Sequence, residues 1–163
     1  MLSDTARYAM RAMMVLAERD GHASILEVAT AASAPRKYLE SILLRLKLDG
    51  LLVSLRGRSG GYALSRPAGE ISVADIIRAT DGPLALAPCA SRTRFEACED
   101  CVDVATCRIR SVLLEGRDAL AEVLERRTLA DLVRNLSSPS RSDGEVDPSF
   151  FGEETEGATR SVL

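Results

Sequence analysis

Tryptophan is absent from this chain of 163 residues, and aromatic residues make up only 4% of it. Ala, Leu and Val therefore supply most apolar side chains, which favours packed helices over a β-sandwich. The sequence also lacks any run near eighteen consecutive apolar residues and any basic-then-apolar signal pattern at its start. We therefore expect a cytoplasmic protein of one compact domain with appendages and no membrane partner.

Histidine is also scarce, since His22 is the only one in the chain. It follows a glycine in an expected turn, where a surface role is the simpler interpretation. Without a second histidine a Cys/His catalytic pair has little support, and the sequence shows no phosphate loop, serine-nucleophile elbow or paired carboxylates. We therefore expect no enzymatic activity and no small-molecule substrate.

Charge is distributed unevenly along the chain. The net charge of −3 by itself argues against nucleic acid, but residues 36–66 carry seven basic side chains against two acidic ones. Residues 137–163 carry six acids against two arginines, are rich in Ser, Gly and Pro, and are expected to be disordered. A basic segment and a separate acidic tail are typical of a nucleic-acid binder.

Helical periodicity, capping residues and turn residues predict the order of the elements. Helices are expected at 3–18, 25–32 and 35–49, strands at 51–55 and 62–64, and further helices at 72–80, 107–126 and 128–135. Three helices followed by a β-hairpin predict a winged helix-turn-helix, since residues 32–34 join the second and third helices tightly. The expected fold is therefore mainly α with a small β-hairpin. The expected division is a winged helix-turn-helix domain (1–82), a cysteine-rich loop (83–107), a long helix with a short terminal helix (108–136) and the tail.

The third expected helix opens with two cations, Arg36 and Lys37, where the stability of an isolated helix would favour acids. DNA phosphates or base edges would supply the missing anions. Glu40 lies one turn further along the same face. Phosphates repel an acidic side chain, so Glu40 would favour binding only as a base reader that accepts a hydrogen bond from a cytosine amine. The alternative is a solvated helix face with an Arg36–Glu40 ion pair.

The two expected strands are joined by a short basic segment, Arg56-Gly57-Arg58-Ser59-Gly60-Gly61. Its glycines keep the hairpin tip narrow and permit positive φ. A slim cationic tip can enter the minor groove of DNA, whose negative potential is greatest where the groove is narrow. A flexible surface turn is the alternative, but a basic third helix together with a basic glycine hairpin is a rarer combination.

Four cysteines fall within nineteen residues: Cys89, Cys98, Cys101 and Cys107. Thiolates grouped in a reducing compartment favour zinc, copper(I) or iron–sulfur clusters over structural disulfides. Structural zinc usually takes two Cys-x₂-Cys pairs, whereas only Cys98 and Cys101 have that spacing here. The uneven spacing favours an iron–sulfur cluster, of 2Fe–2S or 4Fe–4S type, and leaves zinc or a thiol–disulfide switch as alternatives.

The long expected helix is apolar on two sides. One stripe has the four-three spacing of a coiled-coil seam: Ile109, Leu113, Gly116, Leu120 and Val123. The second face consists of Val112, Ala119 and Leu124. A helix packed only on its own domain would leave one stripe exposed, so we expect this helix to form a homodimer, with Gly116 at a close approach of two helices.

Together these motifs resemble the Rrf2 family of transcription regulators over about residues 1–133. The resemblance is carried by Ala6-Arg7-Tyr8-Ala9-Met10, by Lys37-Tyr38-Leu39-Glu40 and, most specifically, by the hairpin segment from Arg56 to Tyr62 with Leu64. It implies a winged-helix homodimer on palindromic double-stranded DNA, often sensing iron–sulfur, redox or nitric oxide status through a cysteine-bound cluster. The expected DNA-contacting residues are Arg36, Lys37, Tyr38, Glu40, Arg56, Gly57, Arg58, Ser59 and Gly60, with Arg56 in the minor groove and Glu40 as base reader.

The resemblance also implies a ligand set in which Cys89, Cys101 and Cys107 match the three cluster cysteines of the family. Some members take a fourth ligand from a histidine three residues after the last cysteine, where this chain has Arg110, and others from an acid of the first helix, where it has Arg7. Neither arginine can ligate, which leaves Cys98 as the fourth candidate. Two alternatives stay open: a zinc- or thiol-based regulator without a cluster, and a redox protein that transfers electrons through the cysteines.

Overall fold

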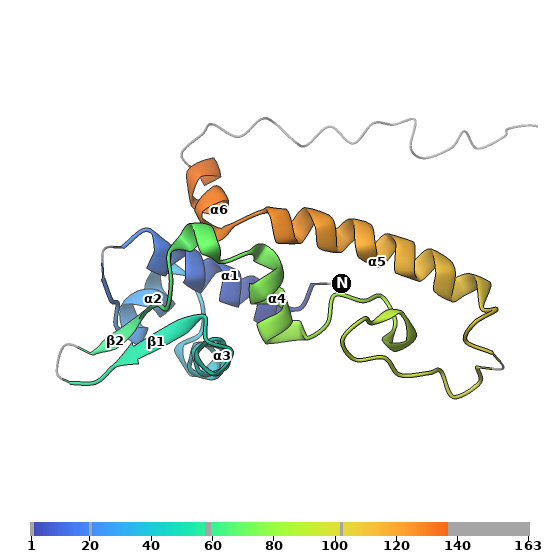
Figure 1. Cartoon of the computed structure of the whole chain (residues 1–163). Helices are drawn as coiled ribbons and strands as arrows, with labels where there is room; N and C mark the ends of the chain where they lie inside the picture. The colour runs from blue at the N-terminus through green and yellow to red at the C-terminus, as the bar shows by residue number, and fades with distance from the viewer. Residues whose placement is uncertain (1, 20, 58–59, 102, 137–163) are drawn as a thin grey trace, which may run out of the picture.

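The computed structural model describes residues 2–19, 21–57, 60–101 and 103–136, so the predicted disordered tail lies outside the described residues. The elements follow one another as α1 (Asp4–Ala17), α2 (Ile25–Ala31), α3 (Arg36–Leu48), β1 (Leu52–Leu55), β2 (Gly61–Leu64), η1 (Ala68–Glu70), α4 (Val73–Asp81), η2 (Pro88–Ala90), α5 (Arg108–Arg126) and α6 (Leu129–Leu136) (Figure 1). The predicted mainly helical fold with one antiparallel hairpin is confirmed. No helix of the described part is both long and apolar enough to cross a membrane.

Serine residues start three of the helices. The side chains of Ser3, Ser24 and Ser72 accept hydrogen bonds from backbone N–H groups in the first turns of α1, α2 and α4. Glu27 and Asp75 return the bond to the cap residues, which completes two capping boxes. These caps are local in sequence, and they explain why the helix starts could be predicted closely.

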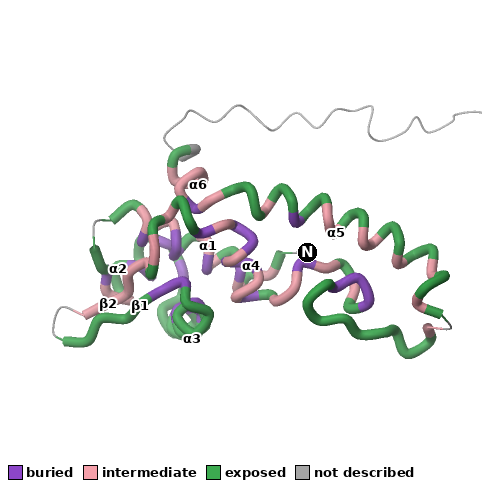
Figure 2. Tube along the Cα trace, in the orientation of Figure 1, coloured by how far each residue is buried: buried purple, intermediate pink, exposed green. Residues whose placement is uncertain are grey.

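The main core lies between α1 and α3. The predicted apolar stripe of α3 is fully buried and consists of Leu39, Ile42, Leu43 and Leu46. It packs in one cluster with Met13 and Leu16 of α1, and Leu129 of α6 is buried in the same cluster. Because this face of α3 is buried, its opposite face is turned to solvent along the whole helix (Figure 2).

The hairpin is attached to the helical core by a close backbone contact. Ala23 and Tyr62 exchange two backbone hydrogen bonds, both with N···O distances of 2.9 Å. A Cβ on Gly61 would lie 2.3 Å from the Ala23 carbonyl oxygen. Gly61 is therefore needed for space between the hairpin and the segment before α2, which fixes the angle at which the hairpin leaves the domain.

The substitution Gly61→Ala is expected to lower the stability of the domain by about 2 kcal/mol, or roughly 10 °C in Tm, because the added methyl group overpacks a backbone contact. The matched control is Gly69→Ala, because a Cβ there would meet nothing within 4 Å. Thermal unfolding followed by circular dichroism measures both variants. Equal Tm values for the two would show that the hairpin moves freely relative to Ala23.

Helix α5 extends away from the winged-helix domain, with the cysteine-containing segment alongside it (Figure 1). Of its residues only Ala121 is buried, in a small second core with Val73, Ala74 and Ile77 of α4. The most exposed apolar side chains of α5 form one stripe: Ile109, Val112, Leu120 and Val123. The helix is thus apolar on two sides as predicted, but Val112 belongs to the exposed stripe and Leu113 to the partly covered side.

Candidate nucleic-acid interface and cysteine site

The outer face of α3 carries the predicted charged residues. Arg36, Lys37 and Glu40 are all exposed, and the Arg36 Nε lies 3.4 Å from the Glu40 Oε1. Within the described residues, α3 has no side-chain N-cap, unlike the three serine-capped helices, and Pro35 stands at the cap position. The first turn of α3 therefore presents cations and uncapped backbone N–H groups together, an arrangement that suits an anionic partner.

Tyr38 lies between α3 and α1. Its hydroxyl is hydrogen-bonded to Thr5, and its ring meets Tyr8 edge to face, with centroids 5.7 Å apart and planes at 83°. The side chain is still 39% exposed. Tyr38, predicted to contact DNA, thus also holds the start of α3 against α1.

At the hairpin tip, Arg56 and Gly57 are exposed, and Gly57 has the positive φ that was expected, at 120°. Positive φ, the reason expected for the glycines of the hairpin tip, is wrong for Gly60, whose φ is not positive. A Cβ on Gly60 would lie 2.5 Å from the Leu55 carbonyl oxygen, so Gly60 is needed for space. Arg58 and Ser59, two further predicted contacts, lie outside the described residues.

A hollow of about 530 Å³ separates α3 from the hairpin. Glu40 and Leu44 line it from α3, while Ser54, Leu55 and Gly60 line it from the hairpin side. The structure therefore brings Glu40 and Gly60, which are twenty residues apart in sequence, to the walls of one groove. Leu44 was not predicted as part of this face.

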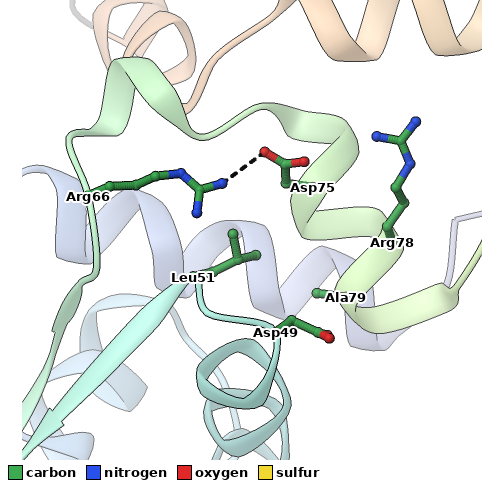
Figure 3. A pocket seen from close by; sticks show the side chains of 6 residues that line it. All are labelled: Asp49, Leu51, Arg66, Asp75, Arg78 and Ala79. Atoms are coloured by element: carbon green, nitrogen blue, oxygen red, sulfur yellow. Dashed lines mark hydrogen bonds and ion pairs between the residues drawn. The ribbon is translucent and has the colours of Figure 1, made fainter.

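Among the described basic residues of the segment, Arg45 and Arg66 have partners on other elements of the domain. Arg45 Nη1 donates to the Thr80 carbonyl oxygen at 3.1 Å, which ties α3 to the end of α4. Arg66 bonds to the Glu70 carbonyl and lies 3.2 Å from Asp75, beside Asp49 and Arg78 around a hollow of about 230 Å³ (Figure 3). The basic charge of the segment is therefore divided between the outer face and the internal support of the hairpin and α3.

The four cysteines line a single hollow of about 480 Å³. Cys89 is buried in η2, Cys98 is exposed, and Cys101 and Cys107 are intermediate, Cys107 being the N-cap residue of α5. A side-chain hydrogen bond with Cys89 raises the pKa of Cys98, so the structure groups Cys98 with Cys89 as well as with its sequence neighbour Cys101.

Two arginines hold the cysteine segment against α5. Arg110 Nε donates to the Cys89 carbonyl at 2.8 Å, and its guanidinium lies 5.6 Å from the centre of the Phe95 ring. Arg92 pairs with Asp118 of α5 through two hydrogen bonds, and this contact, with help from Arg117, holds the pKa of Asp118 well below its usual range. Arg110 cannot ligate a metal, but it positions the backbone of Cys89, a role that the sequence did not reveal.

The donor set fits a sulfur-bound metal centre, because four thiols border one hollow and thiolates are the ligands of iron–sulfur clusters and zinc. Among the described residues, however, no three Cys, His, Asp or Glu side chains are already arranged to bind a metal ion.

Helix α3 and the hairpin that follows it define the class of the protein: it is a winged helix-turn-helix DNA-binding protein. The model of the Rrf2 family, described as an iron-dependent transcriptional regulator, matches residues 2–135. The chain therefore belongs to the Rrf2 family of DNA-binding transcriptional regulators, and it is not an enzyme.

Individual relatives agree with the family. An rrf2-like HTH-type regulator of Rhodobacter capsulatus is 38% identical over 82% of this chain and 92% of the relative. The HTH-type regulator NsrR of Geobacillus kaustophilus is 32% identical over 84% of this chain and 92% of its own length. Among solved structures, CymR, the global cysteine regulator of B. subtilis, superposes with a TM-score of 0.66 at 32% identity, covering 83% of this chain and 97% of CymR.

Proposed function

We propose that this regulator binds a palindromic operator as a homodimer and senses iron–sulfur, redox or nitric oxide status through a cysteine-ligated cluster. In this proposal α3 enters the major groove and the hairpin tip enters the adjacent minor groove. The observation that carries the DNA contact is the uncapped, cationic start of α3, together with the exposed Arg56 of the hairpin. Phosphates would supply the anions that the first turn of α3 lacks.

Selection from random DNA duplexes with the full-length protein, followed by fluorescence anisotropy, tests this DNA contact. We expect enrichment of one two-fold symmetric sequence whose affinity falls steeply as salt rises. Mixed sequences with no shared site and no salt dependence would contradict the proposed mode of binding.

The exposed stripe of α5 supports the dimer. Ile109 and Val112 are 72% and 66% exposed, and Leu120 also lines an apolar hollow of about 580 Å³ between α1, α4 and α5. The stripe and the hollow thus meet at Leu120 and form one apolar surface that a second copy would cover. The nearest described neighbour of a Cβ on Gly116 is the Leu86 side chain at 3.8 Å, so the glycine leaves room on this surface.

The substitution Val112→Glu is expected to convert a dimer into a monomer, because it places a charge in the centre of an interface that excludes water. Sedimentation equilibrium measures the mass, and DNA affinity should fall because one half-site contact is lost. Ser111→Glu is the control, since it adds the same charge to an exposed position beside the stripe. A dimer that survives Val112→Glu but not Ser111→Glu would place the interface on another face of α5.

In the proposed cysteine site, Cys89, Cys101 and Cys107 hold an iron–sulfur cluster, with Cys98 as the fourth ligand. The cluster, when bound, would supply reversible electron transfer and reactivity toward nitric oxide. The shared hollow and the iron-dependent description of the family support this assignment. A thiol–disulfide switch is the second candidate, and the hollow that Cys98 shares with Cys89 supports it.

A contiguous set of contacts leads from the cysteines to α3. Cys107 occupies the N-cap position of α5, η2 with Cys89 packs on α5, and α5 packs on α4. The end of α4 is bonded to α3 through Thr80 and Arg45. We propose that a rearrangement of the cysteine segment shifts α5 and, through these contacts, the spacing of the two α3 helices in the dimer.

A further inference from the structure

An exposed leucine lies in the middle of the outer face of α3. Leu44 is 52% exposed, although the opposite face of the helix buries its leucines almost completely. It follows Glu40 by one helical turn, and both side chains line the hollow between α3 and the hairpin. Leu44 is therefore placed on the same face as the predicted base reader.

Solvation alone does not favour a leucine at this position. Lys, Gln and Glu form helices about as well as Leu, so a polar residue would serve an exposed face without leaving apolar surface in water. In the major groove of DNA, the C5-methyl group of thymine is an apolar partner of the kind that side-chain carbon atoms contact. A leucine that faces the groove can therefore make an apolar contact with the thymine methyl group, which only a base pair containing thymine presents.

We propose that Leu44 is a specificity-determining residue that contacts a thymine methyl group in the operator. The proposal rests on the proposed docking of α3 in the major groove. Four residues of helix advance by about 6 Å, and base pairs stack about 3.4 Å apart. The thymine is therefore expected about two base pairs from the pair that Glu40 reads, on the side where the C-terminal end of α3 lies.

The test removes single methyl groups from the DNA. Each thymine of the selected operator is replaced by deoxyuridine, which differs only in lacking the C5-methyl, and affinities are measured by fluorescence anisotropy. At one thymine in each half-site, the wild-type protein should bind the deoxyuridine duplex about fourfold more weakly, the effect of losing one buried methyl group. Leu44→Ala should bind both duplexes equally, at about the level of the wild type on deoxyuridine or below.

Leu48→Ala is the matched control, because Leu48 lies one further turn along α3 and is 77% exposed. This variant should retain the fourfold difference between thymine and deoxyuridine. Circular dichroism verifies that both leucine variants fold, which the exposure of the two side chains leads us to expect.

The outcomes separate this inference from the proposed function. If the wild type binds its operator but no thymine shows a methyl effect, Leu44 does not read thymine, while the DNA contact stands. If Leu44→Ala weakens the thymine and deoxyuridine duplexes by the same factor, Leu44 contacts sugar or supports the helix, and the inference is overturned. Failure to select any duplex would overturn the proposed docking itself.

Discussion

Replacing Arg36 and Lys37 together with alanine is expected to lower the affinity for all duplexes by about 10- to 100-fold at 0.1 M salt. Each lost phosphate contact removes about 0.9 from the slope of log affinity against log salt, so the slope should flatten by about 1 to 2 units. Both side chains are exposed at the start of α3, so the change should leave folding intact. Anisotropy titrations at several salt concentrations measure affinity and slope together.

Lys47 provides the control for this prediction. It lies in the last turn of α3 and is also exposed, but it is remote from the uncapped first turn. Lys47→Ala should change affinity and slope less than either Arg36→Ala or Lys37→Ala. An unchanged salt slope in the Arg36/Lys37 double variant would remove the start of α3 from the DNA interface.

Substituting Cys89, Cys101 or Cys107 by serine is expected to abolish the visible absorbance of protein purified without oxygen. The thiolates would hold one inorganic core between them, so losing one ligand removes the whole centre. Cys98→Ser is the informative variant: loss of absorbance would make Cys98 the fourth ligand, and retention would require a ligand from elsewhere. Each variant should melt within a few degrees of the wild type, since the cysteine hollow lies outside the main core.

Metal analysis separates the alternatives for this site. Iron and inorganic sulfide should be present in the wild type, and a colourless protein containing zinc would replace the cluster with a zinc site. Absence of iron and zinc, together with a disulfide between Cys89 and Cys98 after mild oxidation, would instead support the thiol switch.

The helices and the hairpin could be predicted because their signals are local. Serine caps, the buried stripe of α3 and the glycine-rich hairpin segment each act within a few residues of where they occur. The internal roles of Arg45 and Arg66 could not be predicted, because their partners lie on α4 or on the segment that leads to it. Sequence spacing explained Gly57, whose φ is positive, but not Gly60, which is confined by the Leu55 carbonyl across the hairpin. Gly61 could not be explained either, because the backbone that confines it is that of Ala23, far away in sequence.

The sequence predicted which residues belong to the candidate site better than it predicted how these residues are arranged in space. The sequence identified the basic face of α3 and the group of cysteines. It assigned Leu44 neither to the basic face nor to the buried stripe of α3. The apolar period of α5 predicted two apolar sides, yet it could not decide which side its own domain covers, because that depends on contacts with residues far away in sequence. Cys89 and Cys98 are nine positions apart in sequence, yet both line the same hollow, which sequence spacing did not predict.

In the proposed function the cysteine site controls the DNA affinity of the winged helix. The direct test is the affinity of oxygen-free wild-type protein for its selected operator, compared with that of Cys101→Ser under the same conditions. We predict affinities that differ by about tenfold or more, the size of a typical coupling free energy between two sites, while the two Tm values stay close. Equal affinities for the two proteins, with absorbance present in one and absent in the other, would contradict the claim.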